Sequence, residues 1–556
     1  MKTKLSILLM SFFFILGGCE KVLNKFPLDK PSDDTFLSSE AELILAINGV
    51  YNDLWDASPT DGQFEYMLDN ATDISWSRGG AFPVLANGNH VSTTSVFQAT
   101  WDRYYTGIAR CNFILTHMDR AIGKASEEVM KEVKGQALFL RAYWYSHLIM
   151  LYGDVPFVTV PLTIAEGNQP RVDKATIVDH LLTDLTEAAE LLPVSWPSSE
   201  RGRVTKGAAF ALKSRVALMD ERHEIAVDGA RQVLELNVYH LYPDYNALFR
   251  YEGESCSEVI FEVMFQNGIR YHGHPLRTYS RNAGGHSTSA PAQSMVDSYE
   301  CIDGLTIDIS PMYDPAKPFE NRDPRLRQSI AVPGDVYLGY QYETHKDSIQ
   351  CWDYNVSPAR RIANQDATNP YASFTGYNWR KTADPMDGGS NRQRSSLNAI
   401  IIRLAEVYLN LAEAKIELNQ IDQECLDAIN AVRSRDNVDM PAIVAGKSQQ
   451  EMRAIIRRER KVELAMEGLR LFDIRRWGIA DRVMPGPFYG RPNKPYSYED
   501  QGIPAIDEDG VLDYSGYADK LTVVEERYFN PDRDYLWPIP QKEMDINGSI
   551  VQNNGY

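Results

Sequence analysis

Cysteine is scarce in this sequence, and no two cysteines have the spacing of a metal-binding or redox pair. Six occur in 556 residues, and the CxxC spacing typical of zinc and thiol redox sites is absent. Cys19 belongs to an export signal described below, and five others are scattered along the chain: Cys111, Cys256, Cys301, Cys351 and Cys425. A Cys301–Cys351 bridge is one alternative, but buried free thiols are the expected state. The pattern excludes a dense disulfide framework.

Long apolar runs and an excess of positive charge are also missing from the body of the chain. The apolar stretch at 143–152 stops at Gly153 and Asp154, and no run after the first 18 residues is long enough to span a bilayer. The formal net charge is −19. So acidic a protein repels phosphate backbones, which argues against nucleic acid as a partner. A hydrophobic content of 44% nevertheless predicts a globular chain with a substantial core.

The common catalytic and cofactor-binding motifs are absent as well. No HExxH, GxSxG, Walker or GxGxxG pattern occurs, so no catalytic residue or cofactor is indicated and we expect a protein that is not an enzyme. His272 and His274 lie two residues apart, but a metal site needs a third ligand and none is visible nearby. The acidic segment 506–513 (IDEDGVLD) lacks the EF-hand register, which leaves structural calcium open without indicating it.

The sequence does begin with a complete export signal. Lys2 and Lys4 precede the apolar run LSILLMSFFFIL at 5–16, and two glycines stand directly before Cys19. That run is too short to span a bilayer but has the length of a signal-peptide core. Small residues followed by cysteine fit the lipobox of bacterial lipoproteins. We therefore predict a signal peptide over 1–18, lipidation of Cys19 and a lipid-anchored tether over 19–37.

Helical periodicity dominates the first half of the mature chain and returns near its end. It predicts helices at Ser38–Trp55, Phe97–Met118, Ser126–Leu151, Lys174–Leu192, Thr205–Asp220, Glu221–Leu236, Ser395–Leu418, Asp422–Arg435 and Ser448–Trp477. Between about 239 and 394 the pattern gives way to loops with a few strand-like runs such as Glu258–Phe265, and the tail 481–556 reads as irregular. A loop-rich segment of this length is typically functional.

Two pairs of predicted helices, over 205–236 and 398–435, resemble each other in length and in their alanine spacing. Pairs of this size are typical of tetratricopeptide repeats, but generic antiparallel packing explains them equally well. We predict a mainly α fold in one domain over 38–556. Its helical scaffold covers 38–238 and 395–480, and the loop-rich insertion between them faces the ligand.

The densest charged segment, 457–477 (RRERKVELAMEGLRLFDIRRW), predicts a structural ion network. Glu459, Glu463 and Glu467 recur every four residues, which places their carboxylates on one face of a helix. The arginines nearby are the expected partners: Arg457, Arg458, Arg460, Arg470, Arg475 and Arg476. Such partners lower carboxylate pKa values, the wrong direction for the general acid of a glycosidase.

Aromatic side chains in loops, beside groups that form hydrogen bonds, are the candidate ligand contacts. A flat ring flanked by Asp, Asn or Arg suits a sugar, whose rings offer apolar faces and a rim of hydroxyls. For any single ring, packing in the core is the more frequent role. The candidates are Asp73, Trp76, Arg78, Tyr271, Arg277, Tyr279, Trp352 and Trp379.

The chain resembles the SusD/RagB family of Bacteroidetes outer-membrane lipoproteins, in the family's order, from about residue 36 to the C-terminus. The stretches that carry the resemblance are LGGC at 16–19, GQALFLRAYWYSHLIMLYGDVPFV at 135–158, GRVTKGAAFALKSRVAL at 202–218, IIRLAEVYLNLAEAK at 401–415, RRERKVELAMEGLRLFDIRRW at 457–477 and YLWPIPQKEM at 535–544. The segment 457–477 and the LWPIP tail are the most specific. The family usually reads NP and QNPGY near its end, where this chain has Asn547-Gly548 and QNNGY.

This resemblance implies four tetratricopeptide-like units with a loop-rich part packed against them. It also implies a lipoprotein of the outer membrane, facing the cell surface, that captures oligosaccharides and passes them to a TonB-dependent, SusC-like porin. In that family the Arg/Glu helix is scaffold and the ligand contacts vary. Only locations carry over, namely the loop around Trp76 and Arg78 and the loops after residue 265.

Three alternatives stay open from the sequence. The same architecture could bind peptides or another nutrient instead of a glycan. A surface glycoside hydrolase and a helical-repeat assembly factor with protein partners alone are the others.

Overall fold

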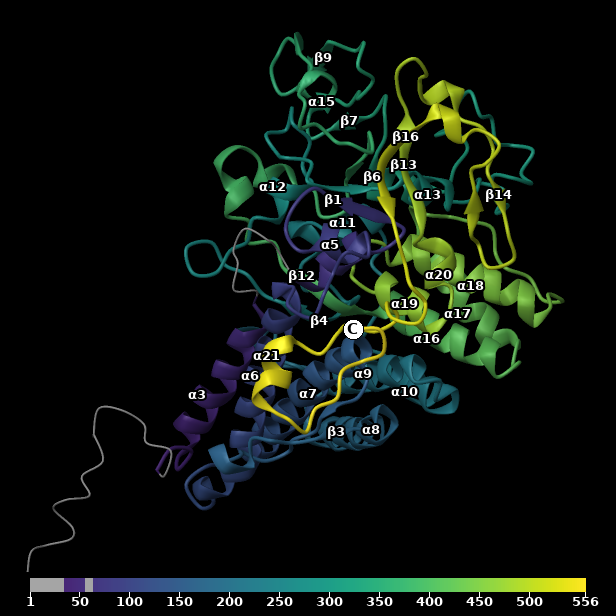
Figure 1. Ribbon diagram of the computed structural model, residues 1–556. Helices are drawn as coiled ribbons and strands as arrows, with labels where there is room; N and C mark the ends of the chain where they lie inside the picture. Colours follow the sequence, from purple (N-terminus) through teal and green to yellow (C-terminus); the bar gives the residue numbers. More distant parts are fainter. Residues whose placement is uncertain (1–34, 56–63) are drawn as a thin grey trace, which may run out of the picture.

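The computed structural model describes residues 35–55 and 64–556 (Figure 1). The predicted signal peptide, Cys19 and nearly all of the predicted tether lie outside the described residues. Long helices fill the lower half of the view in Figure 1, and loops with short strands fill the upper half.

The first helices of the chain form an antiparallel array in which each packs against the next. They are α3 (Glu40–Tyr51), α6 (Ser95–His117), α7 (Glu127–Tyr152), α8 (Lys174–Leu191), α9 (Lys206–Met219) and α10 (His223–Glu235). The side chains of Ser126, Asp173 and Thr205 cap α7, α8 and α9 by accepting hydrogen bonds from backbone N–H groups of the first turn. The predicted helices are thus confirmed within a few residues at each end.

Helix α7 is the central helix of this array, because α3, α6 and α8 all pack against it. From Val133 onward nearly every side chain of α7 is buried. Gly107 of α6 faces the Trp144 ring of α7, and a Cβ at Gly107 would lie only 2.7 Å from that ring. The absence of a side chain at Gly107 therefore lets the two helices approach closely.

The array continues with α16 (Leu404–Glu417), which packs against α10, α17 (Gln423–Arg433) and α18 (Gln449–Glu463). Two predicted boundaries here are wrong. The predicted helix at 395–418 begins with a strand, β12 (Ala399–Arg403), because its run of three isoleucines favours extended backbone. The predicted helix at 448–477 is two helices, α18 and α19 (Arg470–Arg476), since Met466 and Gly468 adopt positive φ values of 62° and 80° between them.

The insertion between α10 and β12 contains short elements, and every helix within it has five residues or fewer. Its two ends meet where β4 (Val259–Val263) pairs antiparallel with β12, with Val263 opposite Ala399. The insertion also contains strands paired in three other sheets. These are β5 (Ser289–Pro291), which pairs with β1 (Ser75–Ser77), β6 (Ile330–Ala331) with β11 (Asn378–Trp379), and a four-stranded sheet of β7 (Val336–Tyr337), β8 (Tyr340–Gln341), β9 (Gln350–Asp353) and β10 (Arg360–Ala363).

The remaining α-helices of the described residues are short. They are α4 (Phe64–Met67), α5 (Phe82–Ala86), α11 (Tyr245–Leu248), α12 (His274–Thr278), α13 (Gln293–Asp297), α14 (Arg325–Ser329), α15 (Gln365–Thr368), α20 (Ala480–Val483) and α21 (Gln541–Ile546). Two further strand pairs are β2 (Val155–Pro156) with β3 (Arg171–Val172) and β14 (Ala505–Ile506) with β15 (Leu512–Asp513).

The tail is more ordered than its sequence predicts. Strands β13 (Gly486–Pro492) and β16 (Leu521–Arg527) pair along their length, beside the insertion in Figure 1. The last residues then return to the helical array, where the Trp537 amide donates to the Leu151 carbonyl at 2.7 Å. The Asn553 side chain donates to the Tyr152 carbonyl at 2.8 Å. The LWPIP segment therefore anchors the tail to the end of α7.

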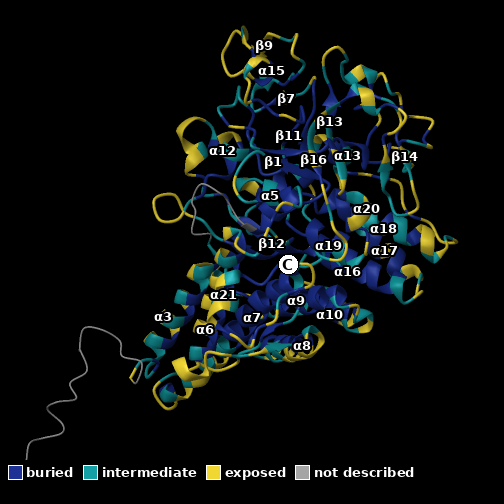
Figure 2. Cartoon of the chain, viewed as in Figure 1, coloured by how far each residue is buried: buried dark blue, intermediate teal, exposed yellow. Residues whose placement is uncertain are grey.

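One continuous core runs from the helical array into the insertion. Figure 2 shows buried residues through the centre of both halves, with exposed residues on the outer turns and loops. The largest fully buried rings come from both halves and from the tail, namely Trp144, Trp379 and Trp537. The five described cysteines are free thiols, so the Cys301–Cys351 bridge does not form.

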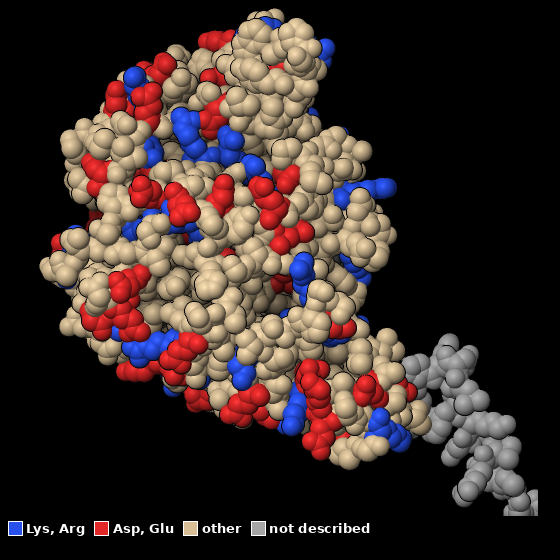
Figure 3. Space-filling model, turned by 180° about the vertical axis from the view of Figure 1, so that it is seen from behind, with Lys and Arg blue, Asp and Glu red and all other residues tan. Residues whose placement is uncertain are grey.

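The charges on the rear face of the molecule are mixed. Figure 3 shows Asp and Glu interspersed with Lys and Arg over most of this face. Lys and Arg gather in its upper part, beside a lobe that is largely uncharged. The acidic surplus of the chain is therefore not one continuous patch on this side.

An ion network links α18 to the insertion, but with partners other than those predicted. Glu463, fully buried, receives hydrogen bonds from Arg403 at 2.7 Å, Arg325 at 3.0 Å and Arg435 at 3.2 Å. Arg325 belongs to the insertion, so the network joins parts of the chain that are far apart in sequence. Burial alone would raise the pKa of Glu463, but the surrounding guanidinium groups hold it well below its usual range.

The arginines near Glu463 in sequence bind other carboxylates. Arg458 pairs with Glu300, Arg460 with Asp473, Arg470 with Asp73, and Arg476 with Glu413. Glu467 lies beyond the end of α18 and pairs with Arg403 and Lys381 instead of continuing the row on the helix face. The prediction of an ion network is confirmed, whereas the predicted partners are wrong.

Candidate ligand-binding surface

The first candidate residues lie on β1 and the loop before it. This three-residue strand pairs antiparallel with β5, with Trp76 opposite Ala290. Arg527 of β16 donates hydrogen bonds to the Thr72 and Ser75 carbonyls at 2.5 and 3.1 Å. A short strand is thereby fixed between the insertion and the tail.

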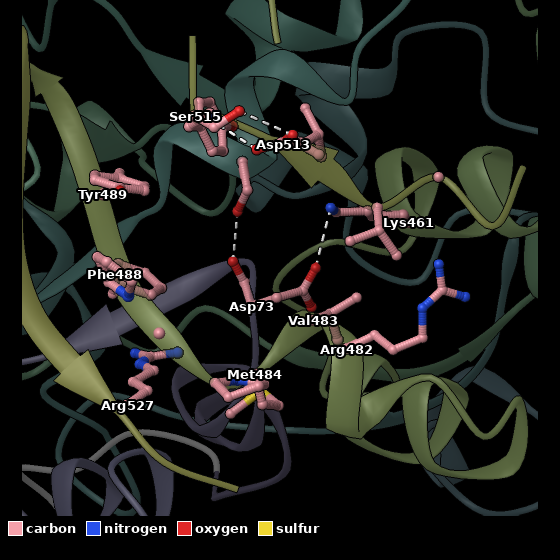
Figure 4. A pocket seen from close by; sticks show the side chains of 18 residues that line it. Asp73, Lys461, Arg482, Val483, Met484, Phe488, Tyr489, Asp513, Ser515 and Arg527 are labelled. Carbon is pink, nitrogen blue, oxygen red and sulfur yellow. Dashed lines mark hydrogen bonds and ion pairs between the residues drawn. The ribbon is translucent and has the colours of Figure 1, made fainter. Parts of the chain in front are cut away.

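Asp73 is part of the scaffold and is not free for a ligand. Its buried carboxylate lies 2.8 Å from Arg470 Nε and 3.1 Å from Lys461 Nζ, at the inner wall of a cavity of about 310 Å³ (Figure 4). Burial would raise the pKa of Asp73, but Arg470 and Lys461 lower it below its ordinary value. The Asp73 carboxylate, predicted as a ligand contact, is therefore already paired with two buried cations.

Asp73→Asn is therefore expected to destabilise the protein. The change leaves two buried cations without their partner, at a cost of about 3 kcal/mol in the free energy of unfolding. Urea denaturation followed by circular dichroism measures it. Asp513→Asn is the matched control, because this exposed carboxylate lines the same cavity. Equal stability of the two variants would contradict the scaffold role of Asp73.

Trp76 and Arg78 instead support two exposed rings, Tyr371 and Phe374. The Trp76 ring stacks on Phe374 with centroids 4.9 Å apart and an angle of 26° between the planes. Trp76 itself is buried and donates through Nε1 to Glu525 at 3.1 Å. We call Trp76, Arg78, Tyr371 and Phe374 the aromatic platform.

Arg78 holds the outer part of this platform. Its guanidinium carbon lies 5.1 Å from the Tyr371 ring centroid and 5.5 Å from that of Phe374. It also donates to the carbonyls of Tyr371 at 2.9 Å and His286 at 3.0 Å. Tyr371 is 60% exposed and Phe374 39% exposed. Two rings of the loop between α15 and β11 are thus exposed to solvent beside the guanidinium of Arg78.

Tyr279 and Trp379 cannot offer stacking surfaces. Both are 0% exposed. The Tyr279 hydroxyl donates to the Asp384 carbonyl at 2.8 Å, and Trp379 Nε1 donates to the Ser75 hydroxyl at 3.3 Å. Their polar atoms find partners inside the protein, so burial costs them little. For these two rings the core role is correct, and we do not retain them as ligand contacts.

The remaining candidates are spread over three elements. Trp352, on β9, is 37% exposed and lies against the guanidinium of Arg361 at 5.4 Å. Tyr271 is half-buried, with Arg394 5.8 Å from its ring centroid. Arg277, in α12, accepts a hydrogen bond on its carbonyl from the Thr288 amide at 2.7 Å, and the Thr288 carbonyl accepts from the Arg78 amide at 2.8 Å. The backbones of Arg277 and Arg78 therefore both bind Thr288, the residue before β5.

The two histidines lie in the interior. His272 Nε2 contacts the Leu397 carbonyl at 2.9 Å, and burial lowers the pKa of His272 to about 4 and that of His274 to about 3. Within residues 35–55 and 64–556, no group of three or more His, Cys, Asp or Glu side chains is arranged to hold a metal ion. In the same residues no helix is both long and apolar enough to cross a bilayer.

Models of two families match this chain. The model described as "SusD family" matches residues 257–556, and the one described as "Starch-binding associating with outer membrane" matches residues 25–218. Together with the helical array and its loop-rich insertion, these matches define the class of protein. The chain belongs to the SusD family, as its sequence resemblance indicated.

Individual relatives agree over nearly the full length. A SusD-like protein of Formosa agariphila is 27% identical over 606 aligned positions, covering 100% of both chains. The crystal structure of a SusD-like carbohydrate-binding protein from Bacteroides fragilis is 30% identical, with a TM-score of 0.80, covering 93% of this chain and 100% of that one. A laminarin-binding SusD-like protein, at 21% identity and a TM-score of 0.62, covers 93% and 100% and shows likeness of fold alone.

Proposed function

We propose that this protein is a non-enzymatic, lipid-anchored protein of the outer membrane that captures oligosaccharides at the cell surface. It delivers them to a partner TonB-dependent, SusC-like transporter. Membership of the SusD family and the likeness to a carbohydrate-binding protein of 30% identity support this function. The family description that mentions association with the outer membrane supports the location.

The observation that carries the proposal is the aromatic platform. Tyr371 and Phe374 are exposed to solvent, Trp76 stacks on Phe374, and the guanidinium of Arg78 lies against both rings. Fixed rings lose little conformational entropy when a sugar stacks on them. A capture protein must also release its ligand, so dissociation constants of about 1 µM to 1 mM suffice, or about −8 to −4 kcal/mol. Two rings and a few hydrogen bonds supply free energies in that range.

Tyr371→Ala and Phe374→Ala are each expected to weaken polysaccharide binding about tenfold, since each removes a stacking contact of about 1.4 kcal/mol. Affinity electrophoresis through gels that contain individual polysaccharides measures this loss. Tyr354→Ala is the matched control, because Tyr354 is also exposed but lies at the tip of the β9–β10 hairpin. Melting temperatures of all three variants are expected to equal that of the unaltered protein.

Three outcomes would contradict the proposal. Equal retention of Tyr371→Ala, Phe374→Ala and Tyr354→Ala on a bound polysaccharide would exclude the platform as the binding surface. No binding to any polysaccharide, with peptides copurifying, would favour a peptide-binding member of the same family. Release of new reducing ends from a polysaccharide by the purified protein would establish a hydrolase.

A further inference from the structure

Three guanidinium groups converge on one loop at the edge of the aromatic platform. The loop is 281–286, with the sequence RNAGGH. Arg281 donates through Nη1 to the Gly285 carbonyl at 3.1 Å, and Arg78 donates to the next carbonyl, that of His286, at 3.0 Å. Arg392 lies over Gly284, where a Cβ would approach its Nη1 to 3.4 Å. We call Arg78, Arg281 and Arg392 the arginine cluster.

The charges of this cluster are not neutralised by neighbouring carboxylates. Within the part of the chain that the structure describes, Arg78, Arg281 and Arg392 form no ion pair, although each is only half-buried and within reach of solvent. Their partners are backbone carbonyls, which use few of the five N–H groups of each guanidinium. Most of their donors therefore remain for a ligand.

The nearest carboxylate to the loop is Asp366, and it faces the backbone. It accepts hydrogen bonds from the amides of Arg281 at 2.6 Å and Asn282 at 3.2 Å. Asp366 is buried, and burial raises its pKa to about 6. The Asp366 carboxylate therefore fixes the backbone of the loop and forms no ion pair with the guanidinium groups of the cluster.

The titration of two groups reflects this positive potential. His286 is exposed at the end of the loop, and its pKa is lowered by partial burial and then by repulsion from Arg281, Arg78, Arg392 and Arg277. The pKa of Arg78 is lowered by partial burial and by Arg281. On a chain with a net charge of −19, a local excess of positive charge has to be held in place by the fold.

We propose that the arginine cluster binds the anionic groups of an acidic polysaccharide, sulfate esters or uronate carboxylates, while its sugar rings stack on Tyr371 and Phe374. This inference rests on the proposed function, because it assigns the ligand class of the same surface. Guanidinium groups present planar pairs of donors that match the oxygens of carboxylate and sulfate. Arg78 belongs to both the arginine cluster and the aromatic platform, so the site for the anionic group lies beside the rings on which the sugar stacks.

The test compares acidic and neutral polysaccharides with matched backbones on the full-length purified chain. Carrageenan is paired with chemically desulfated carrageenan for sulfate, and polygalacturonate with its methyl ester for carboxylate. We expect the unaltered protein to bind one acidic member more tightly than its neutral partner. The double variant Arg281→Gln, Arg392→Gln is expected to lose about tenfold in affinity for that member alone.

Arg201→Gln is the matched control, because Arg201 is an exposed arginine in the connection between α8 and α9 and belongs neither to the arginine cluster nor to the aromatic platform. Arg78 is left unaltered, since its loss would also displace Tyr371. A second measurement needs no variant, because binding of the unaltered protein to the acidic polysaccharide weakens as sodium chloride screens the charges. Binding that is independent of salt would overturn the inference.

The two proposals fail in different ways. Equal binding of acidic and neutral members, or full affinity in the double variant, would overturn the acidic ligand and leave glycan capture in place. No binding to any of the four polysaccharides or to a wider neutral panel would overturn both. Loss on carrageenan alone assigns sulfate as the recognised group, and loss on polygalacturonate alone assigns uronate.

Discussion

Glu463→Gln is expected to lower the free energy of unfolding by about 3 to 5 kcal/mol. The carboxylate is fully buried and accepts hydrogen bonds from Arg325, Arg403 and Arg435. Glutamine keeps the shape of the side chain but removes the negative charge, so three buried guanidinium groups lose a shared partner. The loss is large because water cannot replace that partner in the interior.

Urea denaturation at pH 7 measures the effect, and Glu417→Gln is the matched control. Glu417 forms an ion pair with Arg453 between α16 and α18, but both side chains are partly exposed, so we expect a loss of about 1 kcal/mol or less. A loss for Glu463→Gln no larger than that of the control would show that the network contributes little.

The effect of Glu463→Gln also depends on pH. The pKa of Glu463 is lower in the folded protein than its ordinary value of 4.5, so its charge stabilises the folded state fully above that value. Stability from this group is lost as pH falls toward the folded pKa. The difference between the variant and the unaltered protein is therefore expected to be constant near neutral pH and to narrow in acid.

Gly468→Ala is expected to cost about 3 kcal/mol or more in the free energy of unfolding. Gly468 has a φ of 80°, and a Cβ there would overlap the backbone carbonyl of Glu65. Neither backbone can move freely, because the Gly468 amide donates to the buried carboxylate of Asp69 at 3.2 Å. The substitution would therefore separate the α18–α19 connection from the segment that leads to β1.

Gly478→Ala is the control that separates backbone strain at a positive φ from steric overlap with a neighbouring backbone. Gly478 also has a positive φ, of 64°, but a Cβ there meets nothing within 4 Å. Only backbone strain remains at this position, so we expect a loss of about 1 kcal/mol. Thermal and urea denaturation of both variants test the comparison. Equal losses at Gly468 and Gly478 would mean that the close approach to Glu65 contributes nothing.

The long helices could be predicted from sequence because their signals are local. Apolar periodicity and capping residues such as Ser126 and Asp173 lie within the helix that they define. The break between α18 and α19 has a local signal as well, in Gly468, but the glutamate spacing of the segment suggested one continuous helix. The partners of Glu463 could not be predicted, because Arg325 and Arg403 reach it only through the tertiary fold.

The candidate surface was predicted in part. Loop position identified Trp76 and Arg78, but the same criterion also selected Tyr279 and Trp379, which the fold buries. Tyr371 and Phe374 were missed, although the segment NPYASFTGY at 369–377 has the same composition of aromatic and turn residues. Sequence locates rings in loops, but which rings face solvent is decided by the packing of separate loops against one another.

The pairing of β4 with β12 has a consequence for how such a protein can diversify. The segment between these strands leaves and rejoins the helical array at adjacent points, since Val263 lies opposite Ala399. Apart from residues that join the core or the ion network, such as Trp379 and Arg325, its loops can therefore change in length without altering the spacing of α9, α10 and α16. The segment between β4 and β12 carries Tyr371, Phe374 and two of the three clustered arginines. Ligand-binding loops can therefore vary between related proteins while the helical array stays the same.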